Sequence, residues 1–295
     1  MGNLPQSEKD MARDARNNQW VLTVLIVVAT GTHVCHAQAQ DETWRVVICG
    51  GILQNAEANE AQARTMTGLF TFFTDHLGID REDVSMVCDR ESPAFDANTV
   101  ACTRESLQRM LENLASNDPP AGRFVFYYVG QANHAGATLR LNVQGQDITH
   151  DELARWLGAV NARQKLIILD CPCAGLAIKD LVDPNHIIVC SARGDQYDSP
   201  RFSEYFVPAL LQWPAAKDAG NRLSLLDAFQ TTSRELDAYY ASENCYKSEN
   251  ALLEDDGDGV PSQQPWQFQQ SGKDGAQAAR FYFRKVPKAP SPGDQ

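Results

Sequence analysis

From residue 45 onward, the chain alternates short apolar runs with longer segments in which apolar residues recur every three or four positions. The short runs are mostly rich in β-branched or aromatic residues and are followed by Gly, Asp or Ser, as buried strands often are. The predicted strands are residues 45–49, 83–88, 124–129, 166–169 and 187–190. Alternating strands and helices are typical of a mostly parallel sheet with helices on both faces, so we expect an α/β fold.

The segments between these runs have helical periodicity and residues suited to helix ends. Gly78 is suited to end the first helix and Thr103 to begin the second. Thr149 and Glu152 have the spacing of a capping box. The predicted helices are residues 56–77, 103–114, 149–160, 176–181, 202–211 and 224–240. Residues 138–143 alternate strictly between apolar and polar, which predicts an antiparallel strand with one exposed face.

The N-terminal segment has the pattern of an export signal. Basic residues precede an apolar stretch at residues 20–30, and Ala37-Gln38-Ala39 follows it. We expect cleavage after Ala39, with residues 1–39 as the signal peptide and a secreted or periplasmic protein that has no membrane contact. An uncleaved anchor is the weaker alternative, because a membrane span needs ~20 apolar residues.

Composition and charge narrow the class of partner. The chain is 43% hydrophobic, which is enough for a buried core, and its net charge is −12. Binding to nucleic acid depends on clustered Lys and Arg, so we expect no nucleic-acid partner. Of the eight cysteines, Cys35 lies in the predicted leader. The odd number that remains implies at least one free thiol or an intermolecular bond.

Two turns are expected where ligands bind in open parallel sheets, just beyond the carboxyl ends of the strands. Residues 130–136 (GQANHAG) follow the third predicted strand, and residues 170–175 (DCPCAG) follow the fourth. If these strands are neighbours, ~4.8 Å apart, the two turns can touch.

At these two turns the chain resembles the caspase, metacaspase and legumain group of cysteine peptidases. In that group the third strand ends in Gly-His-Gly, which supplies the base, and the fourth ends in Asp-x-Cys-x-x-Gly, which supplies the nucleophile. The resemblance extends through residues 188–193 and 202–206 and covers roughly residues 43–260. It implies a three-layer caspase-like sandwich. We expect this domain to span residues 40–286, with a Gly-, Gln- and Pro-rich extension from residue 254, a last strand within residues 279–283 and a disordered tail at residues 287–295.

Carried over by position, the base of the group falls on Gln131 and the nucleophile on Pro172, whereas Asp170 and Gly175 match the group. Glutamine does not exchange a proton near neutral pH. Proline has neither a thiol nor an N–H for an oxyanion. We therefore expect a pseudo-peptidase that binds a peptide or protein without cutting it and uses no cofactor or metal. The sequence does not indicate an oligomeric state.

The resemblance also implies which residues contact the bound peptide. The group builds its primary specificity pocket after the fifth strand, where Asp195, Tyr197 and Glu204 lie in this chain. The candidate binding residues are Asp170, Ser191, Asp195 and Glu204.

Two alternatives stay open at the same turns. In the first, the chain is an active endopeptidase with a shifted dyad, with Cys173 or Cys171 as nucleophile and His134 as base. In the second, Cys171, Cys173 and His134 bind zinc or copper, or the two thiols carry redox chemistry, although no fourth ligand is evident. The plainer interpretation is that the cysteines are buried small side chains and that His134 is solvated in a polar loop.

The acidic segment at residues 254–259 (EDDGDG) resembles the start of a calcium-binding loop. The twelfth position from Glu254 is Pro265, however, where such a loop has a bidentate glutamate. The favoured interpretation is a solvated acidic turn.

Overall fold

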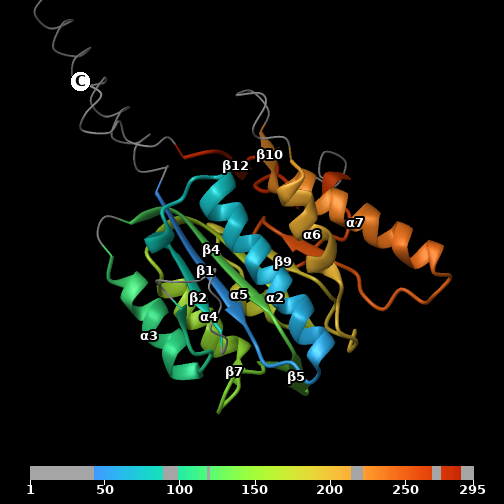
Figure 1. Cartoon of the computed structure of the whole chain (residues 1–295), viewed down its shortest axis with the longest axis horizontal. Helices are drawn as coiled ribbons and strands as arrows, with labels where there is room; N and C mark the ends of the chain where they lie inside the picture. The colour runs from blue at the N-terminus through green and yellow to red at the C-terminus, as the bar shows by residue number, and fades with distance from the viewer. Residues whose placement is uncertain (1–42, 89–98, 118–119, 214–221, 268–273, 287–295) are drawn as a thin grey trace, which may run out of the picture. The chain divides into compact units, whose positions relative to one another are not determined.

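A central seven-stranded sheet organises the part of the chain that begins at Trp44 (Figure 1). The computed structural model describes residues 43–88, 99–117, 120–213, 222–267 and 274–286. The strand order is β11-β9-β8-β4-β1-β2-β3, and every neighbouring pair is parallel except β11 with β9. The strands are β1 (Trp44–Gly50), β2 (Val84–Val87), β3 (Thr99–Val100), β4 (Ala121–Val129), β8 (Ala162–Asp170), β9 (His186–Cys190) and β11 (Leu252–Glu254). The predicted mixed α/β class with a mostly parallel sheet is confirmed.

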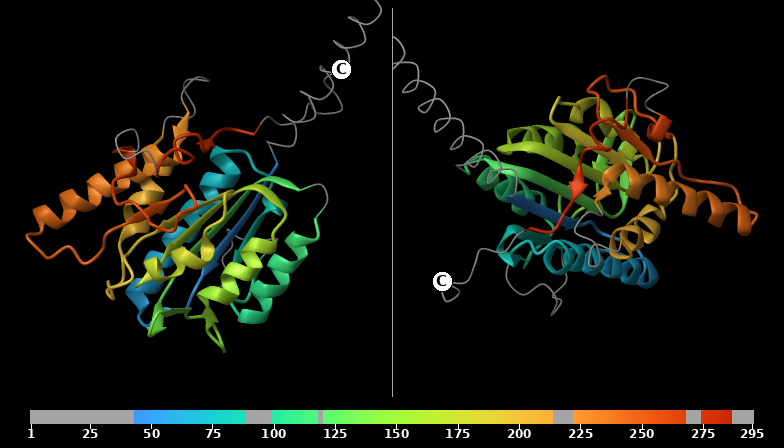
Figure 2. Two further views of the ribbon diagram at one scale, coloured as in Figure 1. Left: turned by 180° about the vertical axis from the view of Figure 1, so that it is seen from behind. Right: turned by 90° about the horizontal axis from the view of Figure 1, so that it is seen from above.

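Helices cover both faces of this sheet because successive strand residues point to opposite sides. Val46 and Ile48 belong to one buried cluster, and Val47 and Cys49 belong to the other. The first cluster includes residues of α2 (Ala56–Thr71), α6 (Phe202–Leu211) and α7 (Leu225–Ser242). The second includes residues of α3 (Arg104–Ala115), α4 (His150–Ala159) and α5 (Ile178–Leu181). Figure 2 shows the sheet between the two sets of helices.

The predicted helix ends are confirmed where capping residues specified them. The Thr103 hydroxyl accepts a hydrogen bond from Ser106 N, and Thr149 and Glu152 form the capping box of α4. A π-helical turn at Phe72–His76 continues α2, and Gly78 follows with a φ of +74°. Only glycine adopts that backbone conformation without a steric penalty, so this helical segment ends where the sequence predicted.

Short strands account for most of the differences from the prediction. Residues 132–135 were expected to be a polar loop, but they form β5 (Ala132–Ala135), which pairs antiparallel with β6 (Thr138–Leu141). β6 is the predicted antiparallel strand, and it also pairs with β7 (Ile148–Thr149). β11 was not predicted, and the last strand is shorter than expected: β12 (Tyr282–Phe283) pairs with β10 (Leu223–Ser224). Strands of two to four residues carry too few positions for a clear pattern.

The predicted signal peptide at residues 1–39 and the predicted tail at residues 287–295 lie outside the described residues. Cleavage and export therefore stay predictions. Within the ranges that the structure describes, no helix combines the length and the apolar character needed to cross a bilayer.

Candidate functional site

The two turns singled out in the sequence lie side by side. β4 and β8 are neighbours, as expected, with Val129 paired to Asp170, and Gly130 N donates to Asp170 O over 3.2 Å. The turn after β1 also approaches them, since a Cβ on Gly130 would lie 2.7 Å from the Cα of Gly51. Glycine at both positions therefore allows the ends of β1, β4 and β8 to converge.

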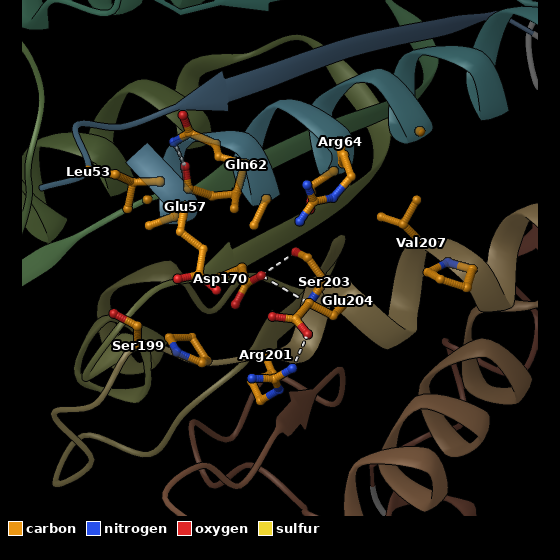
Figure 3. A pocket seen from close by; sticks show the side chains of 18 of the residues that line it. Leu53, Glu57, Gln62, Arg64, Asp170, Ser199, Arg201, Ser203, Glu204 and Val207 are labelled. Atoms are coloured by element: carbon orange, nitrogen blue, oxygen red, sulfur yellow. Dashed lines mark hydrogen bonds and ion pairs between the residues drawn. The ribbon is translucent and has the colours of Figure 1, made fainter. Parts of the chain in front are cut away.

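A cavity of about 740 Å³ opens at this point, between α2, the ends of β4 and β8, and the start of α6 (Figure 3). It lies where the strand order changes direction between β1 and β4, the usual ligand position in open α/β sheets. Gln62 of α2 fixes one wall, because its Nε2 donates to Gly51 O over 2.6 Å and to Val129 O over 2.8 Å. The cavity is therefore held by hydrogen bonds to the strand ends as well as by packing.

Asp170, the last residue of β8, is the most deeply buried carboxylate of the cavity, with 4% of its surface exposed. Its Oδ2 accepts hydrogen bonds from the Ser203 hydroxyl and from Ser203 N, at 3.1 Å for the latter. The Ser203 hydroxyl is also 2.7 Å from the hydroxyl of Tyr127 on β4, which donates to it. This chain of three groups ties the start of α6 to the central strands.

The other carboxylate oxygen of Asp170, Oδ1, is buried and has no hydrogen-bond partner. Burial raises the pKa of Asp170 to about 6, while hydrogen bonding by Ser203 opposes this rise. An unpaired buried acceptor costs roughly 1–3 kcal/mol, so this oxygen favours a ligand that donates an N–H or O–H.

Charged groups of both signs surround this carboxylate. Glu57 and Arg64 reach the cavity from α2, and Glu204 reaches it from α6. Glu204 is paired with Arg201 at 2.5 Å, and the Arg201 guanidinium lies 4.4 Å from the ring centroid of Tyr239. The cavity lining thus contains both acidic and basic side chains, and the buried one among them is Asp170.

Glu249 does not line the cavity, but it binds the backbone just before α6, a helix that forms one wall of the cavity. Its two carboxylate oxygens accept the N–H of Arg201 at 2.9 and 3.0 Å, and its Oε1 also accepts the hydroxyl of Tyr240 at 2.9 Å. Glu249 is fully buried, and burial raises its pKa to about 7. Its role is to fix the backbone at the residue preceding α6.

The candidate residues of the first turn lie at the rim of the cavity or away from it. Gln131 is half-buried and its Oε1 accepts a hydrogen bond from Ser199, a residue of the cavity lining, over 3.3 Å. His134 is exposed on β5, where its ring stacks on Tyr197 at 5.2 Å and its Nδ1 is 2.9 Å from Gly136 O. The expectation of a polar loop at His134 is wrong, although its exposure is as expected.

The second turn is buried. Pro172 is buried, and Cys171 and Cys173 are free thiols with 0% and 1% of their surface exposed. Burial raises the pKa of both thiols, which disfavours the thiolate. The Cys173 thiol donates to Gln196 O over 3.4 Å, and no hydrogen bond joins either sulfur to His134 within the described part of the chain.

The remaining candidate residues lie outside the cavity. Ser191 is fully buried, accepts Cys171 N over 3.1 Å and holds the second turn in place. Asp195 is exposed and forms a two-pronged ion pair with Arg193 at 2.9 Å. Of the four candidate binding residues, Asp170 and Glu204 line the cavity.

Sequence reasoning missed Ser203, Gln62 and Glu249. Each contributes through a tertiary hydrogen bond to a distant backbone or carboxylate group, which no local pattern specifies. One signal was present for Ser203, since a small polar residue in the first turn of an apolar helix is suited to bind a nearby carboxylate.

The acidic segment differs from its predicted character. Glu254 and Asp255 are buried, so the expectation of a solvated turn is wrong for these two residues. Glu254, Asp256 and Asp274 each bring a carboxylate oxygen within 4.8 Å of the others. Among the described residues, this group is the one with three or more side chains placed to hold a metal ion.

No protein-family model and no curated protein matches the chain.

Proposed function

We propose that this protein is an exported caspase-like pseudo-peptidase that binds a peptide in the cavity above Asp170 without hydrolysing it. The sheet supports the caspase-like assignment, because the third and fourth predicted strands are adjacent and their turns meet, as the resemblance requires. An antiparallel strand at the sheet edge and helices on both faces agree with a three-layer sandwich.

The single observation that carries the binding proposal is the unpartnered Oδ1 of Asp170 in the lining of the cavity. A peptide side chain that donates N–H groups would satisfy this acceptor. A cationic side chain would do so best, because a hydrogen bond to an ionised carboxylate is about twice as strong as one between neutral groups. The pKa of about 6 leaves Asp170 mostly ionised at pH 7.5.

Loss of catalysis follows from the residues at the rim and in the second turn. Gln131 offers no general base, and Pro172 offers neither nucleophile nor N–H donor. The thiols of Cys171 and Cys173 are buried with raised pKa values, and His134 is engaged with Tyr197 on another element. This arrangement gives the active alternative no support, and among the described residues no metal-binding group of three side chains includes Cys171 or Cys173.

Fluorescently labelled peptides of the form acetyl-Ala-Ala-X-Ala-amide test this proposal, with X as Arg, Lys, Gln or Leu. We expect binding to the full-length protein at pH 7.5 for Arg and Lys, weaker binding for Gln and none for Leu, by fluorescence polarisation. Asp170→Asn should weaken binding of the Arg peptide at least tenfold. The matched control Asp195→Asn removes an exposed carboxylate outside the cavity and should leave binding unchanged.

Two results would overturn the proposal. One is equal binding of all four peptides, or binding that Asp170→Asn leaves unaltered in a variant that melts cooperatively. The other is cleavage of any peptide, detected by mass spectrometry, that is lost on Cys173→Ala or Cys171→Ala. That second result would establish the active alternative with a shifted dyad.

A further inference from the structure

The loop after β11 brings three consecutive carboxylates together with a fourth from a later segment. Glu254 ends β11, Asp255 and Asp256 follow it, and Asp274 returns from a segment about twenty residues later. A reciprocal pair of hydrogen bonds between Leu253 and Ser262, at 2.8 and 2.9 Å, closes the loop on itself. The carboxylates are therefore placed by the main chain and by their own backbone contacts.

Asp255 is a structural residue in this loop. Its Oδ1 accepts Gly275 N over 2.8 Å and its Oδ2 accepts Ala278 N over 2.7 Å, so both oxygens are used. Its own N–H donates to Asp274 Oδ1 over 3.1 Å, which orients the Asp274 carboxylate. The three remaining carboxylates, Glu254, Asp256 and Asp274, converge within 4.8 Å and are called the acidic triad below.

An independent observation indicates that the acidic triad lacks a partner. Glu254 is fully buried, and its Oε1 accepts Gly257 N and Gly259 N at 2.7 and 3.3 Å. Its Oε2 is buried and has no hydrogen-bond partner. In the described part of the chain, no Lys or Arg forms an ion pair with Glu254, Asp256 or Asp274. Among the residues that the structure describes, these three converging carboxylates therefore have no ion-pair partner, and one of their oxygens has no hydrogen-bond donor.

We infer that the acidic triad binds a hard divalent cation, with Ca²⁺ as the preferred ion. Carboxylate oxygens are the ligands of Ca²⁺ and Mg²⁺, whereas zinc and copper sites favour nitrogen and sulfur. Asp256 is exposed while Glu254 and Asp274 are buried, so the site opens to solvent on one side and water can complete the coordination. An irregular loop with ligands from two segments suits the flexible geometry of Ca²⁺ better than the strict octahedron of Mg²⁺.

The charge environment agrees with this inference. Burial, together with the neighbouring charges of Asp255, Asp256 and Glu254, raises the pKa of Asp274 to about 7, and the hydrogen bond from Asp255 N opposes this rise. A bound cation would relieve this repulsion. It would also join β11, at the edge of the sheet, to the segment that leads into β12, so cation binding should stabilise the fold.

Isothermal titration calorimetry with CaCl₂ or MgCl₂ at pH 7.5, on the full-length protein freed of metal by chelation, tests the inference. We expect one Ca²⁺ per chain, Mg²⁺ binding at least tenfold weaker, and a higher Tm in Ca²⁺ than in chelator. Asp256→Asn removes one charge from the exposed ligand and should weaken Ca²⁺ binding at least tenfold. Asp258→Asn is the matched control, because Asp258 lies in the same loop outside the acidic triad.

Three outcomes would overturn the inference. The first is no heat of Ca²⁺ binding together with an unchanged Tm. The second is equal weakening by Asp256→Asn and Asp258→Asn, which would mean that the charge of the loop, and not the acidic triad, attracts the cation. The third is tighter binding of Zn²⁺ than of Ca²⁺ when the same titration is made with ZnCl₂. None of these outcomes bears on the peptide assay, since no residue of the acidic triad lines the cavity.

Discussion

Glu249 is expected to make the stability of this protein fall as the pH rises through neutrality. Its carboxylate is fully buried beside the start of α6, and burial raises its pKa from an ordinary value of 4.5 to about 7. Between these two pH values the folded state holds a proton that the unfolded chain has released. The free energy of unfolding therefore decreases as the pH rises across this window and is unaffected by Glu249 outside it.

The size of this effect follows from the pKa difference. A rise from 4.5 to about 7 corresponds to about 3 kcal/mol at roughly 1.4 kcal/mol per unit of pKa. Glu249→Gln keeps the side-chain volume and an acceptor for Arg201 N but cannot ionise. The free energy of unfolding of this variant should therefore fall by about 3 kcal/mol less than that of the wild type between pH 4.5 and 8.5.

Urea unfolding followed by circular dichroism at these two pH values measures the difference. Glu235→Gln is a matched control, because Glu235 is an exposed carboxylate on α7 and should keep the wild-type pH dependence. The reasoning is refuted if the free energies of wild type and Glu249→Gln change in parallel with pH. In that case the buried carboxylate is ionised at no cost, and Arg201 N and Tyr240 fully compensate its burial.

Three further predictions concern one turn, the exposed side of α4 and the capping residue Glu152 of that helix. Gly51→Ala would place a Cβ 2.0 Å from Tyr128 Oη, so we expect a loss of at least ~2 kcal/mol in urea unfolding. Gly158→Ala, on the exposed side of α4, meets no atom within 4 Å and should raise the free energy of unfolding by up to ~1 kcal/mol. A neutral Gly51→Ala or a destabilising Gly158→Ala would contradict the packing at that position. Hydrogen bonding with Arg104 lowers the pKa of Glu152 to about 2, so its stabilising effect is present above pH 4.5 and is lost as the pH falls towards 2. Between pH 5 and 3 the free energy of unfolding of Glu152→Gln should therefore fall by about 1 kcal/mol less than that of the wild type, after allowance for solvent screening. Equal losses of stability in thermal melts of the two proteins would exclude this contribution.

The sequence predicted the fold where the information was local. Helix ends were specified by Thr103, Gly78 and the Thr149 and Glu152 capping box, and the structure has them there. The five apolar runs became the five principal strands, since runs buried on both faces carry a strong signal. β11 and β5 were missed because their pairing depends on partners elsewhere in the chain.

The candidate site was predicted in part for the same reason. The rule for parallel sheets predicted that the two turns lie close together, and the predicted binding residues Asp170 and Glu204 line the cavity. Ser203 reaches Asp170 only because α6 packs beside the end of β8. From the sequence, residues 254–259 were considered as a local loop, whereas Asp274 joins Glu254 and Asp256 from outside that loop, which no local pattern specifies.

The two ends of the described fold lie next to each other, far along the strands from the cavity. Trp44 begins β1, its ring stacks on Phe283 of β12 at 6.5 Å, and Val286 N donates to Leu77 O over 2.6 Å (Figure 1). The cavity lies at the opposite, carboxyl edge of the same sheet. A circular permutant that joins residue 286 to residue 44 by a short linker, and opens the chain in the exposed loop at Asn244, should keep the cavity intact. Attaching the described fold to a surface through residue 44 or residue 286 would likewise leave the cavity facing away from that surface.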